Sequence, residues 1–350
     1  MPAKKQKTKT RASASKPHFK ELPPGAHFDH TTVAHALIHL VEPFDNLCRH
    51  SVGIAGGKGA QLGEMTKAGI PVPPGFVVLT HSFDLFLAEN GLVGKIDGLV
   101  NGLDEKDTAK VNKTSETIRK IIAAGTIPQK IAKGIHEEFD KLGAEFVAVR
   151  SSATAEDAAA ASWAGELETY TNVTDGGIVD AVKKCWSSLF TPRALVYRIT
   201  QGMRDKRVSV GVVIQKMVQS EVAGVAFTAN PVTNDLNQMI IEAGWGLGES
   251  VVSGSITPDN YVIDKKKNLV LDVTVNAQEE MIARVRHESK TVPVPAGMRE
   301  KQKLPGQAIM RLADVCKRIE KHYGKPQDIE WALENGKIYI VQTRPVTTLK

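Results

Sequence analysis

Three polar side chains near the C-terminal end of the chain have types that could bind a metal ion and a phosphate group. Glu330 supplies a carboxylate, Gln342 an amide oxygen and Arg344 a guanidinium. Carboxylate and amide oxygens are ligands that suit Mg²⁺, and the guanidinium of arginine suits phosphate. The same residues are also typical of a half-buried β-hairpin with a solvated polar face. Convergence of the three side chains decides between these interpretations.

The stretch from Asp328 to Pro345 predicts a β-hairpin, because two runs rich in Ile, Val, Trp and Tyr flank the turn signal Asn335-Gly336. Gln342 and Arg344 are two residues apart, so they share one face of the second strand. A two-residue turn would set Glu330 opposite Val341 and leave Gln342 on the other face.

A three-residue loop, Glu334-Asn335-Gly336 with Gly336 in a left-handed bulge, would instead set Glu330 opposite Ile340 and Leu333 opposite Lys337. We expect this register, because it brings Glu330, Gln342 and Arg344 together. It assigns the opposite face of the hairpin to five apolar side chains: Ile329, Trp331, Leu333, Tyr339 and Val341.

Two further segments carry residue types that suit a phosphate chain. Glycines around Lys58 precede a predicted helix, where backbone N–H groups can approach an anion and the lysine adds a mobile charge. The spacing is not that of a P-loop. Arg150 emerges at the end of a short buried strand, beside Ser151 and Ser152, and also suits phosphate. The alternative for Arg150 is a structural pair with Glu156 or Asp157.

The chain between Gln215 and Val218 follows a continuous apolar β run, Val208 to Ile214, that predicts a buried strand. A strand that leads into a connector between subdomains can offer its backbone to a flat ring. Met217 and Val218 would then form apolar walls.

The remaining elements supply the scaffold. Residues 31 to 50 have helix-like spacing, and 286 to 305 are typical of an exposed loop. Apolar periodicity predicts helices within 80–142, 176–200 and 307–323, and strands at 76–79, 222–228, 238–242, 261–263 and 270–275. We expect three segments: a basic tail at 1–30, a first subdomain at 31–205 and a second at 206–350.

Composition excludes several classes of protein. The formal net charge of +6 comes from the first 22 residues, so the rest of the chain is formally neutral, which is not the footprint of specific nucleic-acid binding. We interpret the basic tail as disordered. No apolar run is long enough for a membrane span, and the N-terminus lacks the apolar core of a signal peptide. Three widely spaced cysteines indicate reduced thiols and a cytoplasmic location.

Six motifs, in order, together resemble the N-terminal nucleotide-binding domain of the phosphoenolpyruvate synthase (pyruvate, water dikinase) family, whose relatives include pyruvate phosphate dikinase and rifampicin phosphotransferase. The resemblance covers about residues 52 to 348 and implies an α+β, ATP-grasp fold in which two subdomains clasp ATP. The motifs are GGKGAQLGEM from residue 56, IPVPPGFVV from 70, VAVRSSATAED from 147, GVAFTANPVT from 224, EAGWGLGESVVSGSITPDNY from 242 and DIEWALENGKIYIVQTRPVT from 328.

The resemblance also implies roles for individual residues. Lys58 and Arg150 would hold phosphates, and Arg344 would bind the terminal phosphate. Glu330 and Gln342 would ligate Mg²⁺. The remaining positions are Gly165 and Thr169 in a flap over the triphosphate, and Gln215, Met217 and Val218 along the adenine.

The sequence departs from the family at two places beside the flap. Ala158-Ala159 stands where relatives often have Leu-Pro, and Glu166 stands where they often have Gln, so a carboxylate lies close to the expected triphosphate.

The family transfers phosphate from ATP to a histidine on a separate domain, and no histidine here has that motif. We therefore expect the ATP-binding subunit of a split dikinase-type phosphotransferase, which phosphorylates a histidine on a partner subunit. The final acceptor would be pyruvate, or phenol as in phenylphosphate synthase. The alternative is a non-catalytic, ATP-sensing regulatory module.

Overall fold

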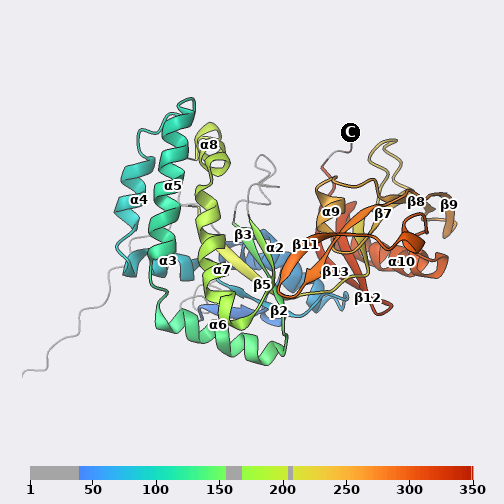
Figure 1. The fold of residues 1–350 in the computed structure, drawn as a ribbon, viewed down its shortest axis with the longest axis horizontal. Helices are drawn as coiled ribbons and strands as arrows, with labels where there is room; N and C mark the ends of the chain where they lie inside the picture. The colour runs from blue at the N-terminus through green and yellow to red at the C-terminus, as the bar shows by residue number, and fades with distance from the viewer. Residues whose placement is uncertain (1–38, 155–167, 204–207, 348, 350) are drawn as a thin grey trace, which may run out of the picture.

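The computed structural model describes residues 39–154, 168–203, 208–347 and 349. These residues form two large β-sheets, each with its own helices, and a small two-stranded ribbon (Figure 1). The α+β class predicted from the sequence is therefore confirmed.

The first sheet is antiparallel, with the strand order β1-β2-β5-β3-β4. Its central strand β5 is the apolar run that the sequence predicts to be buried, and all its residues before Lys216 are buried. The strands are β1 (Val41–Pro43), β2 (Gly75–Val78), β3 (Val147–Ala153), β4 (Thr169–Val173) and β5 (Val210–Lys216).

Six helices accompany this sheet and share its apolar core. Trp186 on α7 is fully buried, and its ring lies 5.4 Å from Phe83 and 5.0 Å from Phe86 on α3, centroid to centroid. Such aromatic contacts add to the stabilisation that burial alone gives. The helices are α3 (Thr80–Glu89), α4 (Val93–Val100), α5 (Thr108–Ala124), α6 (Gln129–Leu142), α7 (Asp175–Ser187) and α8 (Pro192–Thr200), with a 3₁₀ turn, η3 (Ser188–Phe190).

Helix α2 (Val52–Lys67) connects the two sheets. Its buried Leu62 and Met65 belong to the same apolar cluster as residues of the second sheet. The helix is kinked at Gly56, whose φ is +71°. A Cβ atom there would lie 2.1 Å from the carbonyl oxygen of Ser152, so only glycine permits this close approach of α2 to β3.

The second sheet has the order β13-β12-β6-β7-β8-β9, and α10 packs on one face of it. Trp331 and Ile340 are buried on that face, with Leu312 and Cys316 of α10. The elements are β6 (Val222–Phe227), β7 (Gln238–Trp245), α9 (Glu249–Val252), β8 (Asp259–Asp264), β9 (Leu269–Thr274), α10 (Gly306–Tyr323), β12 (Gln327–Glu334) and β13 (Lys337–Pro345).

The small ribbon reaches from the second sheet to the first. It consists of β10 (Glu280–Val285) and β11 (Glu288–Pro293) and is followed by η4 (Ala296–Met298). The Arg284 guanidinium lies 4.4 Å from the ring centroid of Phe146, just before β3. The Ser289 and Thr171 hydroxyl oxygens are 2.7 Å apart. The expectation of an exposed loop at 286–305 was therefore wrong for Glu288–Pro293, which is exposed but pairs with β10, whereas the residues from 294 to 305 form no further strand.

Two other expectations also need correction. The sequence predicts helix-like packing at 31–50, but within the described residues from 39 onward the chain forms β1 and two 3₁₀ turns, η1 (Phe44–Asn46) and η2 (Arg49–Ser51). The predicted division at 205/206 separates β5 from the first sheet, whereas β5 lies between β2 and β3. The chain therefore leaves the first sheet after Lys216.

None of the helices in the described part of the chain is long and apolar enough to cross a membrane.

Candidate active site

The hairpin of β12 and β13 forms around a two-residue turn. Glu334 pairs with Lys337 and Leu333 with Ile338, while Asn335 and Gly336 have φ values of +50° and +72°. The predicted three-residue loop was therefore wrong. Asn-Gly adopts positive φ at both positions at little cost, and such a turn matches the twist of the two strands.

A β-bulge further along the hairpin restores the convergence that the turn alone would prevent. Trp331 pairs with Ile340, but Glu330 pairs with Gln342, so Val341 is the extra residue. Glu330 and Gln342 therefore share a face. The apolar face differs from the prediction as well, because Ile338 and Ile340 occupy it in place of Tyr339 and Val341.

Arg150 reaches from β3 of the first sheet to this polar face. Its guanidinium donates to the side-chain oxygen Oε1 of Gln342 at 2.6 Å and lies 3.4 Å from Oε2 of Glu330. It also donates to the carbonyl oxygen of Val341 at 2.8 Å. The Arg150 side chain is only 11% exposed. The alternative partners Glu156 and Asp157 lie outside the described residues.

Arg344 lies on the same face, two ladder pairs beyond Glu330 and Gln342. It pairs with Asp328 in the ladder, and its Nε donates to the Asp328 carboxylate at 2.8 Å. Burial raises the pKa of the Asp328 carboxyl above its usual range, although Arg344 acts to lower it. Burial, followed by the charge of Asp328, also raises the pKa of Glu242 on β7. The polar face therefore carries an excess of acidic groups.

Asp328 and Glu242 are two residues that our sequence reasoning did not assign to the site. The alternation of β12 contained the signal for Asp328, because it lies two residues before Glu330 on the same strand face. Glu242 could be found only from the order of the strands, since β6 separates β7 from β12.

The donor set fits a hard divalent cation. Glu330 and Gln342 offer a carboxylate and an amide oxygen, and a cationic guanidinium already contacts both. Within the described residues there is no group of three or more His, Cys, Asp and Glu side chains that could hold a metal. Two protein ligands suit Mg²⁺, which commonly completes its shell with waters and substrate phosphates.

The first sheet and α2 place further candidate phosphate ligands around Arg150. Thr169 pairs with Arg150 across the β3–β4 ladder and is exposed. The Ser152 hydroxyl joins β3 to α2, since it donates to the Ala55 carbonyl at 2.8 Å and accepts from the Gly59 N–H at 3.1 Å. Lys58 follows the kink at Gly56, on the stretch of α2 that this contact holds against β3.

The connector from β5 to the second sheet lies beside the hairpin. Gln215 is buried, and its amide donates to the Pro73 carbonyl at 3.2 Å. Met217 is half-buried and its N–H donates to the Phe146 carbonyl at 3.0 Å. Val218 packs in a small apolar cluster with Ala223, Ala332, Tyr339 and Val341.

The structure thus brings Arg150, Glu330 and Gln342 into direct contact. Arg344 extends the same polar face, and Val218 lies beside Val341. Lys58 and Thr169 are placed on elements next to Arg150. Gly165 lies outside the described residues.

Residues 52–350 match the family described as the pyruvate phosphate dikinase AMP/ATP-binding domain. The chain belongs to this family. The predicted resemblance and ATP-grasp fold are therefore confirmed, and the family is one of ATP-dependent phosphotransferases.

Three relatives are longer proteins that match this chain over only part of their own length. The probable phosphoenolpyruvate synthase of Methanocaldococcus jannaschii is 48% identical over 87% of this chain and 26% of its own length. The phosphoenolpyruvate synthase of Pyrococcus furiosus is 41% identical, over 88% and 44% respectively. The rifampicin phosphotransferase of Bacillus cereus is 38% identical, over 87% and 36%. The chain thus spans less than half the length of these relatives.

Proposed function

We propose that this chain binds Mg-ATP between its two sheets and uses it to phosphorylate a histidine on a partner subunit. One observation carries the proposal: Arg150 of the first sheet meets Glu330 and Gln342 of the second. A phosphate-binding cation and two oxygen ligands for Mg²⁺ are therefore brought together from opposite sides of the molecule.

The side chains around this contact have complementary tasks in phosphoryl transfer. Lys58, Arg150 and Arg344 would neutralise the phosphate chain, with Arg344 at the terminal phosphate and Thr169 as a hydroxyl donor. Glu330 and Gln342 would hold Mg²⁺, which would share the charge of the phosphates. Phosphoryl transfer depends mainly on positioning and charge stabilisation, so these residue types are sufficient for the protein's part.

The connector supplies a place for the adenine. Val218, Ala332 and Val341 form an apolar patch directly beside Gln342. A flat ring on this patch, next to Gln215 and Met217, would leave its phosphates directed toward Arg150.

The phosphoryl acceptor is proposed to be a histidine from another subunit. In the described ranges His136 pairs with Asp175 and His322 bonds Glu64, partners outside the candidate site, whereas His287 packs against Phe146, whose carbonyl accepts from the Met217 N–H. Cleavage of the α–β bond would release AMP, and water would release the terminal phosphate as inorganic phosphate, so that the histidine would keep the β-phosphoryl group. Pyruvate and phenol are the two final acceptors that we propose, in a cytoplasmic enzyme without a specific nucleic-acid partner.

The test is AMP formation from Mg-ATP in the presence of a candidate partner that carries a phosphohistidine motif. We expect AMP to appear together with acid-labile label on the partner. Tight ATP binding without AMP formation would favour the ATP-sensing alternative. Label on a histidine of this chain would contradict the proposed partner but retain the phosphotransferase.

A further inference from the structure

The ribbon of β10 and β11 contacts two buried residues of the first subdomain on either side of its turn (Figure 1). These residues are Phe146 and Asn172, which are 6% and 2% exposed. The Arg284 guanidinium on β10 lies 4.4 Å from the centroid of the Phe146 ring. On β11 the Ser289 hydroxyl accepts a hydrogen bond from Nδ2 of Asn172 at 2.9 Å. The ribbon is therefore seated on the first subdomain by one cation–aromatic contact and one buried amide.

Phe146 and Asn172 also hold the connector that leads from β5 to the second sheet. The carbonyl oxygen of Phe146 accepts from the Met217 N–H at 3.0 Å. The side-chain oxygen of Asn172 accepts from the amide of Gln219 at 2.8 Å. Asn172 has a φ of +56°, a conformation that asparagine adopts more readily than most residues. The two residues that the ribbon contacts are thus two that anchor the connector.

The base of the ribbon is fixed to the second sheet by a buried polar network. Asp259 at the start of β8 and Lys303 are both fully buried, and their charged groups lie 2.7 Å apart. Asp259 also accepts from the backbone N–H of Asn276, before the ribbon, at 3.0 Å, and from that of Lys303, after it, at 2.9 Å. A buried network with its partners in place is rigid. One carboxylate therefore ties both ends of the ribbon segment to β8.

We infer that the ribbon is a brace between the two subdomains, and that Arg284 and Ser289 are positioning residues for the connector along which we propose that the adenine binds. The brace is attached to the second sheet at its base and to Phe146 and Asn172 at its tip. It therefore holds the connector in the arrangement of the two sheets that the structure shows. The expected effect on ATP rests on the proposed function, whereas the effect on the connector does not.

The size of the effect follows from the contacts at the tip. A partly exposed cation–aromatic contact favours one arrangement about two- to five-fold, and a neutral hydrogen bond about two- to ten-fold. Loss of both lowers the fraction of molecules in which the connector is in place. The apparent affinity for a ligand that needs this arrangement falls in proportion. The rate at saturating ligand is not affected, because bound ligand selects the same arrangement.

The test is the combined change Arg284→Ala with Ser289→Ala. We expect the apparent Kd for Mg-ATP, measured by calorimetry on this chain alone, to rise about 10-fold. The rate of AMP formation with a partner at saturating ATP should change less than about two-fold. Without ATP, the amide of Met217 should exchange its hydrogen about 10-fold faster, since its acceptor on Phe146 is less firmly held.

Two control proteins separate positioning from a general loss of structure. Arg284→Lys with Ser289→Thr keeps a cation over the ring and a hydroxyl at the amide, and should restore both the Kd and the exchange rate. Lys290→Ala removes an exposed residue of β11 that pairs with Glu288 inside the ribbon at 2.8 Å. This variant should resemble the unmodified protein in both measurements.

Three outcomes would overturn the inference. The first is unchanged ATP affinity and unchanged Met217 exchange in the Arg284→Ala, Ser289→Ala protein. The second is an equal loss in Lys290→Ala, and the third is a slower rate at saturating ATP with unchanged affinity. If the unmodified chain binds no ATP, the proposed function fails, and exchange at Met217 alone then confirms or overturns the brace.

Discussion

The Arg150 guanidinium on β3 donates a hydrogen bond to the side-chain oxygen of Gln342 on β13 at 2.6 Å, across the boundary between the two sheets. The same guanidinium lies 3.4 Å from Glu330. A positive group thus contacts both proposed Mg²⁺ ligands. Binding of Mg-ATP would transfer Arg150 from these oxygens to a phosphate, while the metal takes its position.

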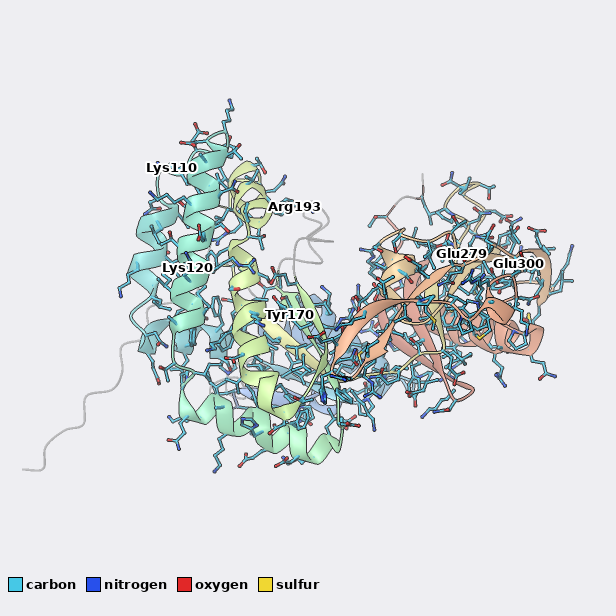
Figure 2. The ribbon with its side chains drawn as sticks, in the orientation of Figure 1. Lys110, Lys120, Tyr170, Arg193, Glu279 and Glu300 are labelled. Carbon is cyan, nitrogen blue, oxygen red and sulfur yellow. The ribbon has the colours of Figure 1, made fainter. Side chains whose placement is uncertain are left out.

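Replacement of the metal carboxylate tests this exchange. Glu330→Gln should weaken the apparent Mg²⁺ affinity in AMP formation by at least ~10-fold, because a charged ligand is lost. The measurement is initial rate against Mg²⁺ concentration at saturating ATP. Glu300→Gln is the control on the exposed surface of the second subdomain (Figure 2). Equal Mg²⁺ dependence in both variants would remove Glu330 from the site.

Removal of Arg344 should affect turnover far more than nucleotide binding. We expect Arg344→Ala to slow AMP formation by ~10³-fold, because an arginine that stabilises the transferring phosphate contributes about that much or more. ATP affinity should change only a few-fold, since the adenine contacts remain. Arg193→Ala on α8 serves as the control (Figure 2). Unchanged turnover in Arg344→Ala would exclude the assigned role.

Cation binding should depend on pH through Asp328 and Glu242. Burial raises the pKa of each carboxyl above its ordinary value. A bound cation favours the ionised forms and lowers both pKa values, so binding releases protons and strengthens as pH rises through the raised pKa values. Calorimetry in buffers of different ionisation enthalpy should detect this release. Asp328→Asn should reduce it, and an unchanged release would contradict the assignment.

Glu64 should stabilise the contact between α2 and α10. Burial acts to raise the pKa of Glu64, but hydrogen bonds from Arg49 and His322 outweigh it and lower the pKa to about 2. A depressed carboxyl pKa adds stability above the unfolded-state value near 4.5, and this stability is lost as pH falls toward about 2.

Glu64→Gln should therefore lower the free energy of unfolding by ~1–3 kcal/mol at pH 7, a range discounted because Arg49 is nearly half exposed. The difference in the free energy of unfolding between Glu64→Gln and the unmodified protein should shrink as pH falls from about 4.5 to about 2. Urea unfolding at several pH values measures it. Glu116→Gln, which breaks an exposed pair with Lys120, should have little effect. A constant difference at all pH values would contradict the linkage.

The approach of α2 to β3 should depend on Gly56. Gly56→Ala combines a positive φ with a Cβ that would lie 2.1 Å from a backbone oxygen of Ser152, so it should destabilise the protein by at least ~2 kcal/mol. It should also weaken ATP binding, because Lys58 is displaced. Gly94→Ala in α4, where a Cβ meets nothing within 4 Å, should be neutral or slightly stabilising. Equal melting temperatures for Gly56→Ala and the unmodified protein would contradict the predicted clash with Ser152.

Local sequence patterns predict the elements of this fold well where periodicity is strong. The helices between 80 and 142, the buried strand β5 and the hairpin around Asn335-Gly336 all follow from apolar spacing and turn chemistry. The order of strands in the sheets does not, because it depends on contacts distant in sequence. For this reason β5 was assigned to the wrong side of the subdomain boundary.

For the candidate site, too, the sequence predicts the residue types but not the contacts that bring them together. The residue types of Glu330, Gln342 and Arg344 indicate metal and phosphate chemistry, but the turn predicted to unite them was wrong. A bulge at Val341 achieves the same convergence by a different route. No residue type marks that bulge, since it reconciles the tight turn with the apolar packing of Trp331 and Ile340 under α10.

The bulge also makes part of the site insensitive to side-chain replacement. Arg150 is held partly by the carbonyl oxygen of Val341, and every amino acid at this position would supply that oxygen. Substitutions at Val341 would therefore record only the apolar wall that its side chain provides. Deletion of the residue would keep Glu330 opposite Gln342 yet remove the carbonyl. The length of this strand, rather than its composition, encodes one of the three anchors of Arg150.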